Sequence, residues 1–182
     1  MPFVSKIKKR YRNVRKRRLC QGDILRDLSF SIEDLKYGSN QKKIHLNFAV
    51  VLSQECDIKW DFDARESGGN NDKFLPVILV CPAYLASPFC NGEHIRDWKM
   101  QNHDINVLKK NDKLKRYHYL HPDIDFSIPE LVIDFKHFFT LPRELLYKYR
   151  STSYVATISE LFREELSQRF SNYLSRIGLP EI

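Results

Sequence analysis

The chain has 182 residues, enough for one domain with a hydrophobic core, and its 42% hydrophobic and 13% aromatic content excludes a disordered protein. No apolar run approaches the ~18 residues of a membrane span, and no signal-peptide core follows the basic N-terminus, so we expect a cytoplasmic protein. Four cysteines are too few for a secreted disulfide framework in a chain of this size, so free thiols are expected.

Residues 1–20 form a basic N-terminal arm. Nine of the 30 Lys and Arg residues precede residue 22 and no acidic residue does, so the net charge of +7 belongs to the arm. Such a segment favours a polyanionic partner: nucleic acid, an anionic membrane surface or an acidic protein. The spacing of Val4, Ile7, Tyr11 and Val14 predicts a short helix, with a frayed, solvated terminus as the alternative.

Residues 21–182 are predicted to form a single domain that begins with strands. A turn leads into a strand at 23–25, and alternating apolar residues predict another at 28–32. The run from Phe48 to Leu52 is apolar throughout, which predicts a central strand buried on both faces. It breaks into a polar tip, Ser53 to Asp57, where we expect a loop.

Further strands are predicted at 74–81 and 130–135, where apolar residues run together. The Gly- and Asn-rich segment 65–72, between the central strand and the strand at 74–81, is expected to be irregular. Residues 82–127 are too many for a simple connection and predict an insertion with structure of its own, including a helix at 95–108.

The chain ends in a predicted amphipathic helix at 157–177. Its apolar residues recur at steps of three and four, Thr157 and Glu160 fit a capping box, and Gly178 fits a C-terminal stop. This helix is expected to pack on the sheet or on a second copy of the chain.

The order of these segments resembles the MazF/PemK toxin family. The matching residues are Gly22-Asp23-Ile24, the strand Ala49 to Ser53, the late strand Leu131 to Asp134 with Leu141-Pro142-Arg143 after it, and the C-terminal helix. The resemblance implies a bacterial protein with an α+β, mainly β fold: an SH3-like small barrel with a long insertion at about 82–127, a basic N-terminal arm and a C-terminal amphipathic helix. It also implies a role in a toxin–antitoxin or phage-defence system.

The sequence departs from that family at its cleavage site. The family has an Arg-Pro pair before the central strand, and its Arg takes part in RNA cleavage, but this chain has His45-Leu46-Asn47-Phe48. The family's hydroxyl residue at the head of the following strand is also unmatched. Two alternatives follow: the barrel is kept and the ribonuclease chemistry is lost, or that chemistry is rebuilt at another site.

The polar tip offers one candidate site. Cys56 is a possible nucleophile that Asp57, Glu55 or His45 could orient, and Ser53 is a further catalytic candidate in the same tip. A thiol at the end of a strand is more often structural. Cys81, Cys90 and His94 could bind zinc, but their spacing is not that of a usual ligand pair, so we predict no metal and no cofactor.

The insertion offers a second candidate. Lysines precede the cluster Arg116-Tyr117-His118-Tyr119-Leu120-His121, which combines cations for phosphate with rings for base stacking. His118 or His121 could also act as a general acid or base in metal-independent RNA cleavage. The alternative is that Tyr117 and Tyr119 pack inward as strand residues.

We therefore predict binding of RNA or DNA through the arm, the insertion and the last helix. The residues expected to take part are Lys8, Lys9, Arg10, Arg12, Arg15, Lys16, Arg17, Arg18, Lys115, Arg116, Tyr117 and Arg169. The other hypothesis is a non-catalytic component that docks on a protein partner or on a second copy of itself.

Overall fold

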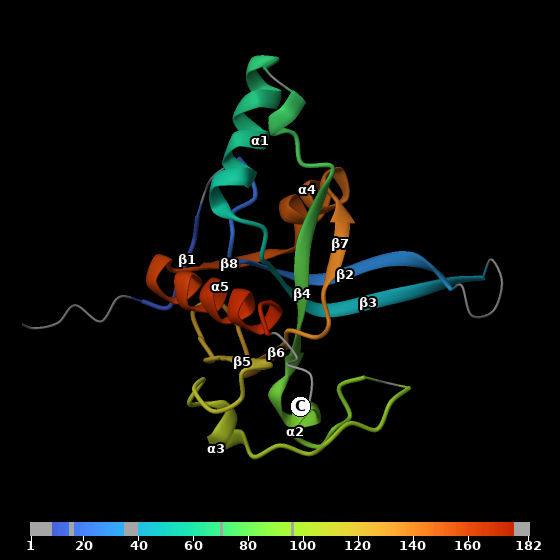
Figure 1. The fold of residues 1–182 in the computed structure, drawn as a ribbon, viewed down its shortest axis with the longest axis vertical. Helices are drawn as coiled ribbons and strands as arrows, with labels where there is room; N and C mark the ends of the chain where they lie inside the picture. The colour runs from blue at the N-terminus through green and yellow to red at the C-terminus, as the bar shows by residue number, and fades with distance from the viewer. Residues whose placement is uncertain (1–8, 15–16, 35–39, 70, 96, 177–182) are drawn as a thin grey trace, which may run out of the picture.

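The computed structural model describes residues 9–14, 17–34, 40–69, 71–95 and 97–176 (Figure 1). These residues form a mixed α+β fold in which an antiparallel sheet curls into a half-barrel. The strands follow the order β1-β8-β2-β3-β4-β6-β5, and β7 also pairs with β4. Their bounds are β1 (Tyr11–Arg12), β2 (Asp23–Asp34), β3 (Asn40–Val51), β4 (Val77–Leu85), β5 (Tyr117–Leu120), β6 (Leu131–Asp134), β7 (Phe139–Pro142) and β8 (Tyr154–Ile158).

Helices cover both faces of this sheet. One core contains side chains of α5, the other contains side chains of α1 and α4, and a smaller core lies inside the insertion. The helix bounds are α1 (Glu55–Ser67), α2 (Ala86–Cys90), α3 (Ile105–Leu108), α4 (Arg143–Ser153) and α5 (Glu160–Leu174), with a 3-10 turn η1 (Asn71–Lys73). No helix in the described ranges is long and apolar enough to cross a membrane.

The central strand is confirmed at β3. Val50 packs into the core under α5, while Ala49 and Val51 pack into the core under α1 and α4, and all three are fully buried. Residues 49–51 pair with β4 on one side, and Ala49 and Val50 pair with β2 on the other. An apolar run with no polar alternation is what a strand needs when both of its faces are covered.

The strands predicted at 23–25 and 28–32 form one long strand, β2, which pairs with β3 in a hairpin that projects beyond the sheet (Figure 1). Asp27 lies between the two segments with a φ of 55°, in the left-handed region. Leu25 and Leu28 reach the same core although they are three residues apart, because this irregular residue shifts the alternation.

The polar tip is not a loop throughout, because α1 begins at Glu55. The buried carboxylate of Asp61 fixes this helix: it accepts hydrogen bonds from Arg65 within α1, from Leu75 N at 2.9 Å and from Arg143 at the start of α4. Asp61 is 1% exposed. One carboxylate therefore holds two helices and the approach to β4 together.

The predicted helix at 95–108 is wrong except for its last turn, α3. Gly92 has a φ of 73°, and the Met100 carbonyl oxygen lies so close to it that a Cβ would collide. Met100 N donates to Gly92 O at 3.0 Å, so the chain folds back on itself here. Asp104 then caps α3 by accepting from Asn106 N at 2.8 Å.

The C-terminal helix is confirmed, but it begins later than predicted and two elements before it were missed, α4 and β8. Thr157 lies in β8 and donates to Asp23 at 2.6 Å, so it does not form a capping box with Glu160. Leu166 is buried in the core under α5, whereas Leu161 is exposed. The residues of the proposed stop lie outside the described ranges.

The predicted helix in the arm is wrong at Tyr11, which forms β1 and pairs with Ile158 of β8. Val4 and Ile7 lie outside the described residues. Farther along the arm, Val14 N donates to the Tyr154 hydroxyl at 2.9 Å. A short, mostly basic helix is only marginally stable in water. Pairing with the open edge of the sheet gives the backbone groups of this segment hydrogen-bond partners within the fold.

Candidate nucleic-acid interface

The arm and the insertion meet in a narrow cleft beside α5, which we call the arm–insertion cleft. Tyr11 is fixed there because its hydroxyl donates to His121 O at 2.6 Å, and Ser159 N donates to Arg10 O at 2.8 Å. The cavity has a volume of about 20 Å³, room for roughly one water molecule. Its lining residues are Arg10, Tyr11, Asn111, His118, Tyr119, Leu120, His121, Ile158, Phe162 and Glu165.

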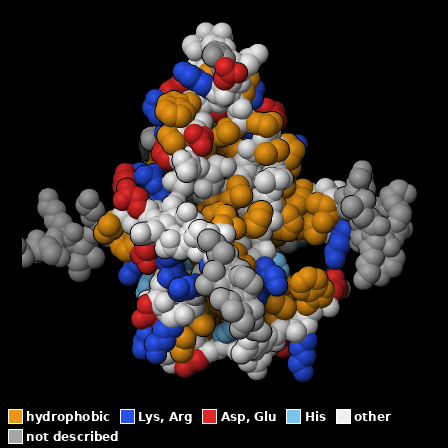
Figure 2. All heavy atoms as spheres, viewed as in Figure 1, with side chains coloured by type: hydrophobic (Ala, Val, Ile, Leu, Met, Phe, Trp, Pro, Cys, Tyr) orange, Lys and Arg blue, Asp and Glu red, His pale blue; other side chains and the backbone are white. Residues whose placement is uncertain are grey.

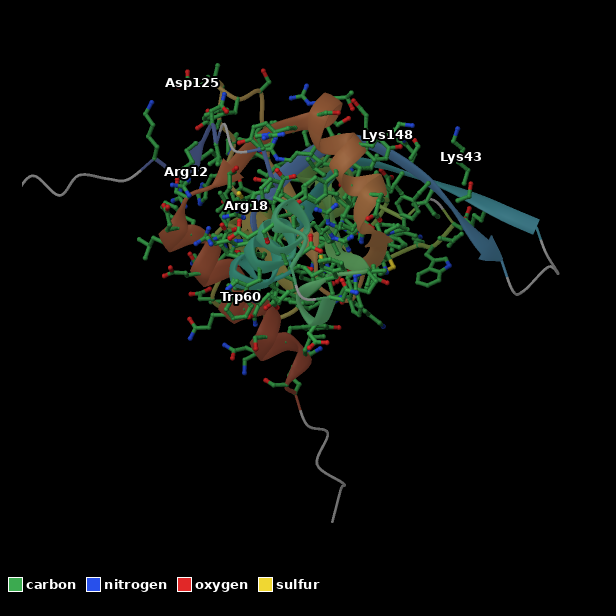
Figure 3. All side chains as sticks on the ribbon, turned by 90° about the horizontal axis from the view of Figure 1, so that it is seen from above. Arg12, Arg18, Lys43, Trp60, Asp125 and Lys148 are labelled. Carbon is green, nitrogen blue, oxygen red and sulfur yellow. The ribbon has the colours of Figure 1, made fainter. Side chains whose placement is uncertain are left out.

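Arg10 supplies the cation of the cleft. Its guanidinium carbon lies 4.5 Å from the centre of the Phe162 ring, and its side chain is exposed. A guanidinium above an aromatic face contacts the ring through its own flat face, so the N–H donors in the guanidinium plane stay free to reach a phosphate. In Figure 3, Arg12 of the arm and Asp125 of the insertion lie on the same side of the molecule.

The insertion side of the cleft is held rigidly. The side chain of Asn111 donates to Tyr119 O at 3.0 Å and accepts from Tyr119 N at 2.7 Å. Arg169 of α5 donates to the carbonyl oxygens of Asn111, Leu114 and Tyr117. The segment before β5 is therefore tied both to that strand and to the last helix.

The two histidines of the cleft differ in environment. His118 is 4% exposed, its Nδ1 has no partner among the described residues, and burial lowers its pKa to about 3, so it is neutral at pH 7. His121 is half-buried, and burial, Arg10 and Lys109 lower its pKa. His121 is thus the histidine that a ligand in the cleft would meet.

Two glutamates lie in or near the same cleft. Glu165 of α5 lines the cleft and is exposed. Glu130 accepts from the Tyr119 hydroxyl at 2.5 Å and pairs with Lys109 at 2.7 Å, which holds the pKa of Glu130 below its usual value. A cation, an imidazole and a carboxylate line one cleft, and such groups can bind a phosphodiester that lies across its mouth and can move a proton.

Some of the basic arm residues that we expected to bind nucleic acid have partners inside the fold, and others are exposed. Arg12 pairs with Glu160 at 2.5 Å, and Arg18 pairs with Glu55 at 2.5 Å, so both have internal partners. Lys9 and Arg17, like Arg10, are exposed. The remaining predicted arm residues, Lys8, Arg15 and Lys16, lie outside the described ranges.

The residues expected to bind nucleic acid from the insertion and the last helix likewise include both exposed and internally bonded side chains. Lys115 is exposed, whereas Arg116 makes a two-point ion pair with the buried Asp134. Tyr117 is buried as an inward-facing strand residue, and Arg169 is engaged by the three carbonyls described above. Contacts inside the fold thus occupy Arg116, Tyr117 and Arg169.

The polar tip lies apart from the arm–insertion cleft, with α1 at the top of Figure 1 and β5 near the bottom. Ser53 Oγ accepts from Leu79 N at 2.9 Å, which ends the β3–β4 ladder. Cys56 is exposed, and its Sγ lies 3.5 Å from Gln54 Oε1 and 3.6 Å from Asp57 Oδ1. The structure therefore does not join Ser53, Cys56 and Asp57 with His118 in one site.

The described ranges contain no group of three His, Cys, Asp or Glu side chains that could hold a metal ion. Cys81 is fully buried in the core under α5, and Cys90 packs against the small core of the insertion. Burial raises the pKa of both thiols. This environment favours packing over metal binding for these cysteines.

Sequence reasoning missed Asn111, Phe162 and Glu165 as members of the cleft. Asn111 has a φ of 53°, a conformation that Asn tolerates well, and the pair Asn111-Asp112 is a turn signal in the sequence. The spacing of the last helix places Phe162 on its apolar face but does not connect it with the arm. No pattern in the sequence indicates that α5 packs beside the arm.

The chain matches no model of a known protein family, and no curated protein is significantly similar to it.

Proposed function

We propose that the protein binds single-stranded nucleic acid across the arm–insertion cleft. The observation that carries this proposal is that Arg10 of the arm and His121 of the insertion line one cavity. The two basic regions of the sequence therefore form one surface. Arg10 would contact a phosphate, and a strand leaving the cleft would pass exposed lysines on both sides.

The charge of the surrounding surface supports this path. Lys9 and Arg10 are exposed on the arm, and Lys110, Lys113 and Lys115 are exposed around the end of α3. Figure 2 shows Lys and Arg side chains, with carboxylates between them, at the lower left of the molecule, where Figure 1 has α3 and β5. Mixed charge of this kind favours binding at a few phosphates over wrapping of a long duplex.

RNA cleavage without a metal is a second candidate function, favoured by the presence of His121 and Glu165 in the same cleft. One of the two would take the proton from a ribose 2′-hydroxyl, whose oxygen attacks phosphorus. The other would protonate the departing 5′-oxygen, leaving a 2′,3′-cyclic phosphate. Arg10 would stabilise the charge that develops on the phosphoryl oxygens.

The likeness to the MazF/PemK family is part of the same proposal. A curled antiparallel sheet that carries a C-terminal helix on one face supports an SH3-like barrel of that kind. A protein of that family would act in a toxin–antitoxin or phage-defence system. Its cleavage chemistry would here come from the cleft and not from the segment before the central strand.

Binding is tested by titrating the full chain against a labelled single-stranded RNA and the matching DNA at several salt concentrations. Arg10→Gln is expected to weaken binding and to lower the slope of log affinity against log salt by about one. Lys148→Gln is the matched control, because Lys148 is exposed on the side opposite to Arg12 in Figure 3. Equal binding by both variants would contradict the proposed surface.

Cleavage is tested with the same RNA. His121→Gln and Glu165→Gln should each abolish the 2′,3′-cyclic product while RNA is still bound. Binding without cleavage by the unmodified protein would leave nucleic-acid binding as the function and remove the nuclease. Binding that survives high salt, or copurification with one fixed protein, would favour the protein-docking alternative instead.

A further inference from the structure

A groove opens where β3 and β4 separate. The two strands pair only through Ala49–Pro82, Val50–Cys81 and Val51–Val80, after which β3 continues with β2 alone and β4 continues with β6. The groove between them has a volume of about 240 Å³. Its lining residues are His45, Leu46, Asn47, Phe48, Pro82, Ala83, Tyr84, Leu85, Pro88, Glu93 and His94.

One wall of the groove is an open strand edge of β3. Ser29 N donates to the Tyr149 hydroxyl at 2.9 Å, and the same hydroxyl donates to Ser29 O at 2.5 Å. Both backbone groups of Ser29 therefore face away from β3, so the Ser29–His45 pair exchanges no ladder hydrogen bonds. The N–H and C=O of His45 consequently point away from β2, into the groove.

The other wall is an open edge of β4. Leu52 N donates to Leu79 O at 2.8 Å on the β3 side, whereas Ala86 N donates to Glu130 O at 2.9 Å on the β6 side. Because backbone groups alternate between the two edges of a strand, Ala83 and Leu85 share the edge of Leu79. The described part of the chain places no strand on this edge beyond Pro82.

An exposed ion pair joins β3 to the insertion, between two residues that do not line the groove. Lys42 of β3 pairs with Asp97 of the insertion at 3.1 Å. The Lys42 side chain is 50% exposed and the Asp97 side chain is 63% exposed. Such an exposed ion pair is worth at most about 1 kcal/mol, so it does little to hold β3 and the insertion together. On the right of Figure 2 the surface is hollowed between the hairpin and the insertion.

We propose that this groove binds an extended segment of a partner protein, which enters as a strand between β3 and β4. The existing ladder continues directly into the groove, and the facing edges offer donors and acceptors at His45, Ala83 and Leu85. Extended backbone is the ligand that satisfies two such edges together. Phe48, Tyr84 and Pro88 give the lining an apolar character, which selects apolar side chains at alternate positions of the segment.

The probe for the test is a fluorescein-labelled peptide of eight residues that alternate valine and threonine, with lysine at both ends for solubility. Its matched control carries N-methyl groups on alternate amides, which removes the donors of one edge and leaves the side chains unchanged. We expect saturable binding of the first peptide and roughly tenfold or greater weakening for the second, because several backbone hydrogen bonds are lost together.

Hydrogen exchange locates the peptide on the full chain. Bound peptide should slow exchange of the His45, Ala83 and Leu85 amides. Asn47→Trp should weaken binding by filling the groove, whereas Lys43→Trp, at an exposed position that does not line it, should not. This surface is distinct from the arm–insertion cleft, so Arg10→Gln should leave peptide affinity unchanged.

Four results would overturn the proposal. The N-methylated peptide could bind as well as its parent, the protection could fall elsewhere, or no binding could be detected. Protection of the same amides that rises with protein concentration in the absence of peptide would identify a second copy of the chain as the occupant, and would equally reject a partner protein.

Discussion

Arg116 and Asp134 form a two-point ion pair in which Nε donates to Oδ1 at 2.7 Å and Nη2 donates to Oδ2 at 2.5 Å. The carboxylate is fully buried, and Lys136 N donates to it at 3.0 Å. Arg116 precedes β5 and Asp134 ends β6, so the pair joins the insertion to the sheet.

Removing the cation of this pair should destabilise the protein strongly. Arg116→Met leaves the Asp134 carboxylate buried without compensation, and we expect a loss of about 3–5 kcal/mol in the free energy of unfolding measured in urea. Lys115→Met, next to it and exposed, should change that free energy by less than about 0.5 kcal/mol. A small loss for Arg116→Met would mean that the backbone donor alone satisfies Asp134.

Asp61 should make the protein sensitive to acid. Burial raises the pKa of this carboxyl, but hydrogen bonds from Arg65 and Arg143 outweigh it and hold the pKa below its ordinary value. The stabilisation is therefore present above about pH 4 and is lost as the pH falls through the pKa of the folded state. Asp61→Asn should remove this acid dependence and cost about 3–5 kcal/mol at pH 7.

The control for Asp61 is its neighbour on the same helix, Asp63, whose pair with Lys59 is exposed. Asp63→Asn should cost no more than about 0.5 kcal/mol. Equal effects of the two substitutions would show that α1 is not fixed by the buried carboxylate.

Asp23 should produce the opposite pH dependence. Burial raises its pKa to about 6 despite hydrogen bonds from Thr157 and Cys20 N. Because the folded state then favours the protonated carboxyl, the free energy of unfolding should decrease as the pH rises from about 4 to about 6. Asp23→Asn should flatten this interval in a series of thermal unfolding curves, and an unchanged profile would exclude Asp23 as its source.

His94 should destabilise the insertion in acid. Its ring stacks on Phe89 with centroids 4.1 Å apart, both ring nitrogens lack partners among the described residues, and burial lowers its pKa to about 4. The neutral ring is favoured on folding, so stability is full above about pH 6.5 and falls as the pH drops towards 4. His94→Phe should reduce that loss, as measured by near-UV circular dichroism.

The sequence predicted the parts of the fold that depend on continuous apolar patterns. The run from Phe48 to Leu52 marked the central strand, and the spacing around Leu166 marked the last helix, because burial on a strand or helix leaves a direct trace in hydrophobicity. Helix α4 was missed because Tyr147, Tyr149 and Arg150 make its pattern look polar. The insertion was misread because a reversal at Gly92 leaves no periodic signal.

The candidate site was predictable only as two separate regions. The basic arm and the cluster around His121 stand out by composition, but the cleft depends on Tyr11 pairing with Ile158 across most of the chain. Local patterns carry no information about such a contact. For the same reason, the sequence did not show that Arg18, Arg116 and Arg169 would serve internal carbonyls and carboxylates.

The three carbonyls held by Arg169 tie the stability of two distant segments together. When α5 detaches, the guanidinium leaves Asn111, Leu114 and Tyr117, and the turn before β5 loses its support. The last helix and the entry to β5 should therefore open as one cooperative unit, with amide exchange rates that rise together in mild denaturant. A ligand or substitution that displaces α5 would therefore loosen the part of the cleft that carries His118 and His121, even without contacting these residues.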